Sequence, residues 1–309
     1  SVNVEHGDRR RVCNTAVEMD FGGRARLSLQ VSRPYFWLVT VWLYLLPTGQ
    51  QYALLSEGSF WLGLAYCTYP LNLLVYLMND MSDVKVDKHN QRKGGSGTGA
   101  KASVAALREL AGWTIGAQVP FLLCFVLLWG PIAVPWLLSV VFVNWLYNFG
   151  PRLSSNYAPL DLLCPCGYLL VIPLSAALNR VPLPAARCWA HTLFLVVRTQ
   201  LWLQTFDLDT DAAGGRRTTA VLLGLRPAQL LLALLLAGEL AFVLTHFSDW
   251  ALQSFSAASL LLLALQVAFA PVPGSGRPLS RATIERTFLV MGLGGLGLMA
   301  QVWLNGAFL

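Results

Sequence analysis

Long apolar runs constrain this chain more than any other feature. They recur from about residue 34 to the C-terminus, with no polar domain between them. A helix needs roughly 20 apolar residues to cross the hydrocarbon core of a bilayer, and these runs are continuous, whereas the strands of a membrane barrel alternate. We therefore expect an all-α integral membrane protein, a bundle of about nine transmembrane helices. The expected spans are 34–54, 59–79, 103–129, 131–149, 160–179, 187–206, 226–247, 250–271 and 284–307.

The composition agrees with a membrane protein. Hydrophobic residues make up 55% of the chain and charged residues 12%, which excludes a water-soluble domain with an ordinary surface. We expect a polar N-terminal segment over 1–33 and one transmembrane domain over 34–309. The N-terminal segment is rich in Arg and has no apolar core followed by a small-residue cleavage site, so we expect no cleavable signal peptide.

The placement of Lys and Arg predicts the orientation. With nine spans, almost all basic loop residues fall on the side of the N-terminus, and the opposite side carries only Arg180 and Arg187. Cytoplasmic loops of membrane proteins show this excess, so we expect the N-terminus on the cytoplasmic face or its organellar equivalent. The same bias explains the net charge of +6. No nucleic-acid motif accompanies that charge, and we expect no nucleic-acid partner.

A polar stretch closes the second expected span. Asn79, Asp83 and Asp87 are four residues apart, so on a helix they project from one face at steps of about 6 Å. Aligned oxygen ligands of this kind bind hard cations such as Mg²⁺ or Ca²⁺. Taken alone, the pattern also fits a solvated helix end whose carboxylates pair with neighbouring basic residues.

A second acidic stretch at the end of the sixth span favours the metal interpretation. Asp207 and Asp211 share a helical face, whereas Asp209 points elsewhere if the helix continues. Both acidic stretches fall on the same predicted side of the membrane. Two opposed carboxylate sets with Mg²⁺ between them can clamp a diphosphate. The predicted metal ligands are Asn79, Asp83, Asp87, Asp207 and Asp211.

Basic residues lie close in sequence to both acidic stretches. Arg92 and Lys93 follow the first, Arg216 and Arg217 follow the second, and Arg152 lies in the loop between them. Guanidinium groups can hold phosphate oxygens bidentately. For any single one of these residues, the excess of cytoplasmic basic residues is the competing explanation.

Other polar features leave alternatives open. The loop from Gly94 to Gly99 is either a lid or a flexible linker. Cys164 and Cys166 have no further ligand nearby, so ordinary packing is favoured over a metal or redox pair. Arg198 either approaches the acidic site or neutralises a partner, and for Glu239, which lies inside a span, we expect an interhelical hydrogen bond.

Several motifs resemble the UbiA superfamily of intramembrane prenyltransferases. The stretch Asn79-Asp80-x-x-Asp83-x-x-x-Asp87 is similar to the first signature of that family, which lies at the end of its second helix. The stretch from Asp207 to Asp211, followed by Gly215-x-x-Thr218, resembles its second motif.

A third stretch gives a weaker match. The segment from Tyr147 to Ser154 resembles the family's tyrosine-proline-basic stretch after the fourth helix, although many members have lysine where this chain has Ser154. Arg33-Pro34 is similar to the family's entry to its first helix, and Arg92 falls where a phosphate-binding arginine is common.

The resemblance implies a UbiA-like bundle around a central cavity, in which the domain over 34–309 is catalytic. It implies a Mg²⁺-dependent enzyme that ionises an isoprenoid diphosphate at the cytoplasmic face and transfers the prenyl group to an acceptor, expected to be aromatic. The implied catalytic residues are Asp83, Asp87, Asp207, Asp211 and Tyr147. The implied substrate-binding residues are Asn79, Asp80, Arg92, Arg152, Asp209 and Arg217.

Two alternatives stay open. A UbiA-type terpene cyclase would form the same cation and capture it with the substrate's own double bonds. A transporter could bind a coupling cation with the same acids, but its charged groups would be expected near the bilayer midplane, whereas these lie at helix ends. The role of Tyr147 is also open, because a tyrosine at this position can be an interfacial anchor or can stabilise a cation with its ring face.

Overall fold

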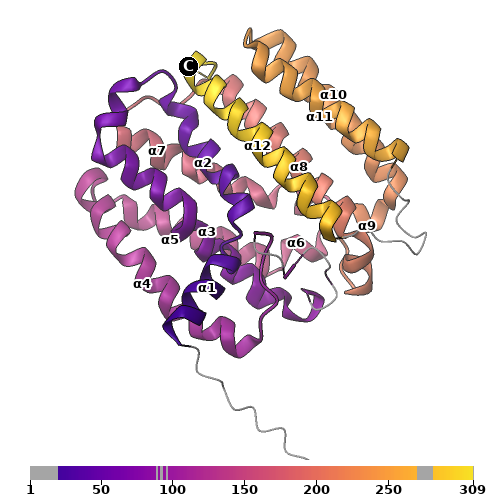
Figure 1. Cartoon of the computed structure of the whole chain (residues 1–309), viewed down its shortest axis with the longest axis horizontal. Helices are drawn as coiled ribbons and strands as arrows, with labels where there is room; N and C mark the ends of the chain where they lie inside the picture. The colour runs from indigo at the N-terminus through magenta and orange to yellow at the C-terminus, as the bar shows by residue number, and fades with distance from the viewer. Residues whose placement is uncertain (1–19, 88–89, 91–92, 95–96, 270–280, 309) are drawn as a thin grey trace, which may run out of the picture.

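The computed structural model describes residues 20–308, apart from 88–89, 91–92, 95–96 and 270–280 (Figure 1). The described part of the chain is built of α-helices joined by short loops and 3₁₀ turns. The helices are α1 (Phe21–Val31), α2 (Trp37–Leu45), α3 (Gly58–Asp87), α4 (Val104–Trp129), α5 (Ala133–Asn148), α6 (Leu153–Asn156), α7 (Val171–Asn179), α8 (Ala186–Ala213), α9 (Thr219–Leu223), α10 (Leu225–His246), α11 (Trp250–Phe269) and α12 (Arg281–Asn305).

The all-α class is confirmed, and each expected span contains a helix. Five described stretches are long and apolar enough to cross a membrane, so the count of nine spans stays a prediction. Those five are Gly58–Asp87, Val104–Trp129, Leu160–Asn179, Leu225–His246 and Trp250–Ala268.

Two local features differ from a simple row of helices. The fifth span begins with 3₁₀ turns at Leu160–Leu162 and Cys164–Leu170 before α7 starts. Pro165 lies in the first turn of the second of these and cannot donate a backbone hydrogen bond. The second feature is α1, a helix inside the segment that the sequence indicated only as polar; Asp20 caps it by accepting from the Gly23 amide at 2.8 Å.

Helices α3 and α8 extend beyond the apolar runs that predicted them. Helix α3 continues through the first acidic stretch to Asp87, and α8 continues through the second to Ala213. The two ends approach closely, because a Cβ added at Gly214 would lie 2.9 Å from both methyl groups of Val86. Any larger residue at position 214 would have to displace the Val86 side chain. The close approach brings the two acidic stretches together.

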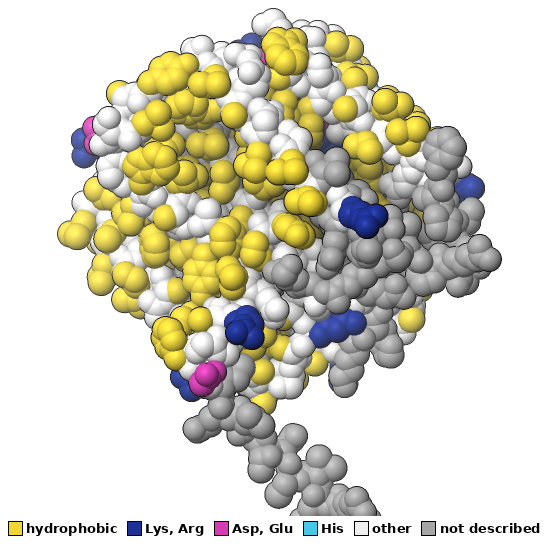
Figure 2. Space-filling model, in the orientation of Figure 1, with side chains coloured by type: hydrophobic (Ala, Val, Ile, Leu, Met, Phe, Trp, Pro, Cys, Tyr) yellow, Lys and Arg dark blue, Asp and Glu magenta, His cyan; other side chains and the backbone are white. Residues whose placement is uncertain are grey.

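The helices surround an interior that is open at its centre. Helices α10 and α11 lie side by side at one edge, α4 lies at the other, and α12 runs between them in front of α8 (Figure 1). An aromatic core that includes Tyr44, Phe60, Tyr66 and Phe125 fixes the part around α2, α3 and α4. Hydrophobic side chains dominate the face shown in Figure 2 and charged ones are sparse there, as lipid contact requires.

A buried ion pair joins α8 to α10. Arg198 contacts Glu239 through its Nε atom, and His191 Nε2 lies 3.3 Å from the other carboxylate oxygen. All three side chains are almost fully buried. Arg198 therefore neutralises a partner instead of reaching the acidic site, and Glu239 has an interhelical ion pair where the sequence predicted an interhelical hydrogen bond.

Candidate active site

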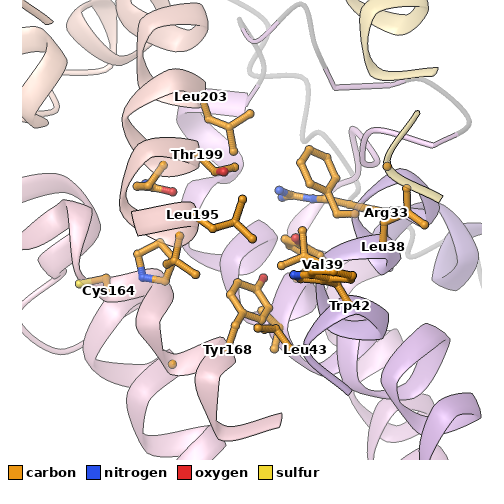
Figure 3. A pocket seen from close by; sticks show the side chains of 18 of the residues that line it. Arg33, Leu38, Val39, Trp42, Leu43, Cys164, Tyr168, Leu195, Thr199 and Leu203 are labelled. Atoms are coloured by element: carbon orange, nitrogen blue, oxygen red, sulfur yellow. The ribbon is translucent and has the colours of Figure 1, made fainter. Parts of the chain in front are cut away.

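A cavity of about 1130 Å³ opens between the helices and extends from the acidic stretches into the apolar interior. Figure 3 shows its central section. Leu195, Thr199 and Leu203 project from one face of α8, at the four-residue spacing of a helix, toward the α2 wall that carries Val39 and Trp42. The cavity is therefore polar at one end and predominantly apolar along its length.

The predicted face of α3 lines the polar end. Asn79, Asp83 and Asp87 all border the cavity, whereas Asp80 points to another side. The amide of Asn79 donates to Asp83 Oδ2 and to Asn148 Oδ1, both at 3.1 Å. These bonds fix the orientation of the amide, so its Oδ1 is the oxygen turned toward the basic residues.

Arg33 and Lys93 hold the first acidic stretch from the side of Asp80. Arg33 Nη2 donates to Asn79 Oδ1 at 2.7 Å and also to Asp80. Lys93 Nζ lies 2.6 Å from Asp80 Oδ1 and forms a second ion pair with Asp87. Arg33, Lys93 and Asp80 are all buried. Asp80 thus positions two cations, and both cations border the cavity.

Arg152 approaches the same stretch from the loop after α5. Its Nη2 lies 3.2 Å from Asp83 Oδ1 and 3.5 Å from the carbonyl oxygen of Ser82. Both Arg33 and Arg152 have positive φ angles, 52° and 53°, although neither is glycine. Such backbone strain gathers at functional sites, where surrounding contacts maintain it.

Arg216 joins the two acidic stretches. One of its terminal nitrogens forms an ion pair with Asp83 on α3, and the other lies 3.0 Å from Asp211 Oδ1 on α8. A second link is the Asn90 amide, which donates to Asp207 Oδ1 at 3.4 Å. Asp207 and Asp211 both border the cavity. The ends of α3 and α8 therefore converge on one volume.

The turn after α8 explains why Arg216 occupies this position. Gly215 has φ of +72°, a conformation that favours glycine, and the Arg216 amide donates to the Asp211 carbonyl at 2.9 Å. Burial alone lowers the pKa of the Arg216 guanidinium, but the carboxylates of Asp83 and Asp211 more than offset this and raise its pKa above the ordinary value. Arg216 is therefore a permanent cation between the two stretches.

Several predicted residues lie elsewhere. Asp209 is exposed, as its helical position predicted, and Arg217 is also exposed; neither borders the cavity. Arg216 occupies the place that the sequence interpretation gave to Arg217, and the Gly214-Gly215 turn is the signal that could have distinguished them, because it folds the next residue back onto the helix end. Arg92 lies outside the described residues, as do parts of the loop from Gly94 to Gly99.

Tyr147 borders the cavity next to the polar end. Its hydroxyl accepts a hydrogen bond from Gln200 Nε2 at 3.4 Å. Ser154 occupies the position at which the sequence resemblance gives lysine in many proteins. It donates to the Tyr147 carbonyl at 2.8 Å and also borders the cavity. Ser154 thus ties the segment after α5 to the end of that helix, and no charge stands at this position.

Two sequence relatives each match about two thirds of this chain. A lycopene elongase/hydratase from Corynebacterium glutamicum is 28% identical over 213 residues, 66% of this chain and 72% of that protein. A 4-hydroxybenzoate octaprenyltransferase from Acidovorax ebreus is 29% identical over 223 residues, 65% of this chain and 70% of that protein. No family model matches the sequence.

The solved structures decide the fold. A UbiA homologue from Archaeoglobus fulgidus bound to DMAPP and Mg²⁺ superimposes with a TM-score of 0.59 at 17% identity, covering 89% of this chain and 99% of that one. Its complex with GPP and Mg²⁺ gives a TM-score of 0.56 at 16% identity, covering 88% and 99%. The chain has the UbiA fold. The predicted resemblance is thereby confirmed, and the UbiA fold and the five apolar helices identify a multi-pass membrane protein.

The donor set at the polar end fits Mg²⁺. Within the described part of the chain, no three His, Cys, Asp or Glu side chains lie close enough to form a metal cage by themselves. Mg²⁺ commonly binds one or two carboxylates together with water and substrate phosphates, and it does not require such a cage. Carboxylate and amide oxygens from α3 and α8 provide hard ligands of this kind across the cavity of the UbiA fold. Basic side chains already pair with the carboxylates of the first acidic stretch, so positive charge is stable at this end of the cavity; these side chains are Arg33, Lys93, Arg152 and Arg216.

Proposed function

We propose that the chain is a Mg²⁺-dependent membrane prenyltransferase that ionises an isoprenoid diphosphate and transfers the prenyl group to an acceptor. The main support is the convergence of two acidic helix ends on one cavity, bridged by Arg216 between Asp83 and Asp211. The solved UbiA homologue complexes contain DMAPP or GPP with Mg²⁺, which supports the same ligands here. The predicted catalytic domain over 34–309 is part of this proposal.

The proposed reaction divides between the two ends of the cavity. The bond between C1 and the diphosphate oxygen breaks, and its electron pair leaves with pyrophosphate. An acceptor carbon then bonds to C1, and a proton leaves the acceptor. Bound Mg²⁺ would supply positive charge that stabilises the leaving pyrophosphate. The residues that would hold it are Asn79, Asp83, Asp87, Asp207 and Asp211.

Basic side chains at the polar end are suited to hold the phosphates. Lys93 and Arg216 border the cavity and already lie against the carboxylates. Phosphate oxygens that enter between the two acidic stretches can accept hydrogen bonds from the same guanidinium and ammonium groups. We propose Arg216 as the main phosphate contact from the α8 side, with Arg152 and Arg33 supporting the α3 side.

The apolar part of the cavity is suited to the prenyl chain and to a carbocation. Trp42 and Tyr168 border the cavity, as does Tyr147 next to its polar end, and aromatic ring faces stabilise cations without capturing them covalently. Leu38, Val39, Leu43, Leu195 and Leu203 in Figure 3 give the cavity walls an apolar lining, which limits water near the reacting carbon. This location favours cation stabilisation over interfacial anchoring as the role of Tyr147.

The relatives support two classes of acceptor. The name of the Acidovorax ebreus relative indicates an aromatic acceptor, 4-hydroxybenzoate, and the name of the Corynebacterium glutamicum relative indicates lycopene, a long polyene hydrocarbon. We propose an aromatic acceptor and keep a hydrocarbon as the second candidate, favoured by the apolar cavity. A terpene cyclase, which needs no acceptor, is the remaining alternative. An assay of each acceptor, and of the donor alone, distinguishes the three by product.

The decisive experiment compares two acids on α8. We expect purified protein with Mg²⁺ and GPP to release pyrophosphate and form a prenylated product, and Asp207→Ala to abolish both. Asp209→Ala is the matched control, because Asp209 is exposed on the same helix turn and does not border the cavity; it should retain turnover. Removal of Mg²⁺ with EDTA should stop turnover while the helical circular dichroism stays unchanged. Full turnover by Asp207→Ala would contradict the proposal and reopen a transporter function.

The proposed sidedness follows the basic residues. We propose that the polar end of the cavity and the N-terminus face the cytoplasm, because the loops at that end carry most of the Lys and Arg residues. The single variants Arg217→Cys and Arg180→Cys should react with a membrane-impermeant thiol reagent from opposite sides of sealed vesicles. Labelling of both from one side would contradict this topology.

A further inference from the structure

Asp161 is a fully buried carboxylate outside both acidic stretches. It lies in the 3₁₀ turn Leu160–Leu162 at the start of the fifth span and has no exposed surface. Its Oδ2 accepts from the Thr219 amide and from Gln204 Nε2, each at 2.7 Å, and its Oδ1 accepts from the Thr219 hydroxyl. A buried charge is tolerated only with such complete hydrogen bonding.

These bonds connect three elements at the polar end of the cavity. Gln204 lies on α8, one turn before Asp207, and borders the cavity. Its Oε1 accepts from the Ala220 amide at 3.2 Å, so both ends of this side-chain amide are fixed. Thr219 is the first residue of α9. Asp161 therefore joins α8 and the start of α9 through one side chain.

The segment held in this way carries Arg216. Only the turn from Gly214 to Thr218 separates the end of α8 from the start of α9. The turn is anchored at its α8 end by the Arg216 amide on the Asp211 carbonyl, and at its α9 end by the bonds of Asp161 to Thr219. With both ends fixed, the Arg216 guanidinium is held between Asp83 and Asp211.

We infer that Asp161 is a positioning residue that holds Arg216 and the second acidic stretch in the geometry needed to bind the diphosphate. This inference rests on the proposed function and assigns a role to a residue that touches neither substrate nor metal. A loss of the bonds of Asp161 releases the turn and widens the distribution of Arg216 positions. A displacement on the scale of 1 Å can cost about 10²-fold in rate.

The carboxylate and the side-chain amide of this network can be exchanged between positions 161 and 204. In Asp161→Asn, an amide nitrogen at the Oδ2 position faces the donors of Gln204 and of the Thr219 amide and loses both bonds. An amide nitrogen at the Oδ1 position can donate to the Thr219 hydroxyl, but the remaining bonds are then no longer made to a charged acceptor and are weaker. In Gln204→Glu, two carboxylates face each other. The double variant, Asp161→Asn with Gln204→Glu, restores the bond between position 161 and α8. Its new side-chain amide can donate to the new carboxylate on α8 and accept from the Thr219 hydroxyl, while that carboxylate still accepts from the Ala220 amide; of the original bonds, only the one from the Thr219 amide is lost.

Two measurements test the inference. The first is the KM for GPP and for Mg²⁺ at saturating acceptor, which each single variant should raise about tenfold or more and the double variant should return to within about threefold of wild type. The second is independent of turnover: the rise in thermal midpoint caused by inorganic pyrophosphate with Mg²⁺. This rise should be lost in each single variant and recovered in the double.

The outcomes separate the possible failures. Single variants with lower thermal midpoints but unchanged KM and an unchanged pyrophosphate response would show a purely structural role and overturn the inference. If the single variants fail to fold, Thr219→Val, which removes one hydroxyl and keeps the amide, takes their place; an unchanged KM there also overturns it. A wild-type chain that neither binds pyrophosphate nor turns over GPP overturns the proposed function itself.

Discussion

Helix α8 carries two groups of buried charges, a middle group and an end group, and the charges within them are neutralised differently. In the middle of the helix, Arg198 pairs with Glu239 on α10, so one permanent cation meets one acid. At its end, Asp207 and Asp211 face the acids of α3 across the cavity. Within the described residues, this end gathers five carboxylates around Arg33, Lys93, Arg152 and Arg216, whereas the middle group needs no further ion.

The comparison of these two groups indicates which of them can gain free energy by binding a ligand. A self-neutralised pair in the membrane interior attracts no ligand, and its main effect is to join helices. A group with several carboxylates and several cations at a cavity end has unfavourable repulsion that Mg²⁺ and phosphate can relieve together. The middle group should therefore respond to substitution through stability, and the end group through ligand binding and turnover.

The largest expected effect is on turnover at the end group. Asp83→Ala removes a carboxylate that borders the cavity and pairs with Arg152 and Arg216. We expect turnover of GPP to fall by about 10²–10³-fold, because charge stabilisation on the leaving group is lost. The thermal midpoint in detergent should change little. A collapse of the thermal midpoint with normal turnover per folded molecule would reverse the comparison.

The middle group should show the opposite response. Glu239→Ala leaves the Arg198 guanidinium buried without its partner, which costs about 3–5 kcal/mol in unfolding free energy. Thermal denaturation in detergent measures this loss. Replacing both partners, as Arg198→Met with Glu239→Leu, should restore most of the stability, since an apolar pair of similar volume is often neutral. If the double variant stayed as unstable as Glu239→Ala, the pair would have a role beyond mutual neutralisation.

Adjacent arginines give a finer test of the end group. Arg216→Gln removes the bridge between Asp83 and Asp211, and we expect the KM for GPP to rise by about 10-fold, the value of one charge-assisted hydrogen bond. Arg217→Gln is the control, because Arg217 is exposed and does not border the cavity. Equal increases in both variants would assign the effect to the overall positive charge of that face.

The sequence contained most of what defines the end group. Four-residue spacing predicted that Asn79, Asp83 and Asp87 share a face, and that Asp209 points away from Asp207 and Asp211. These predictions depend only on helix geometry, and α3 and α8 continue through both stretches. The convergence of the two helix ends was predictable only as a hypothesis, because it depends on packing contacts such as Gly214 against Val86.

Sequence reasoning missed two features of the site. Asp161 stands alone between apolar residues, and its partners Gln204 and Thr219 lie far away along the chain, at separations of 43 and 58. The choice between Arg216 and Arg217 depended on the backbone of a glycine turn with positive φ. Contacts set by tertiary packing or by a single dihedral angle leave no periodic pattern in a sequence.

The smallest effect is expected from the third member of the middle group. His191 Nε2 lies 3.3 Å from Glu239, and its ring packs against Phe247 and Phe308, with centroid distances of 5.8 and 5.5 Å. His191→Phe keeps the aromatic packing and removes the polar contact, while Arg198 still neutralises the acid. We expect a loss of about 1 kcal/mol in unfolding free energy and unchanged KM for GPP. A loss as large as that of Glu239→Ala would mean that the imidazole shares the charge balance of the carboxylate, and the middle group would then be a three-membered network instead of a pair with a neighbour.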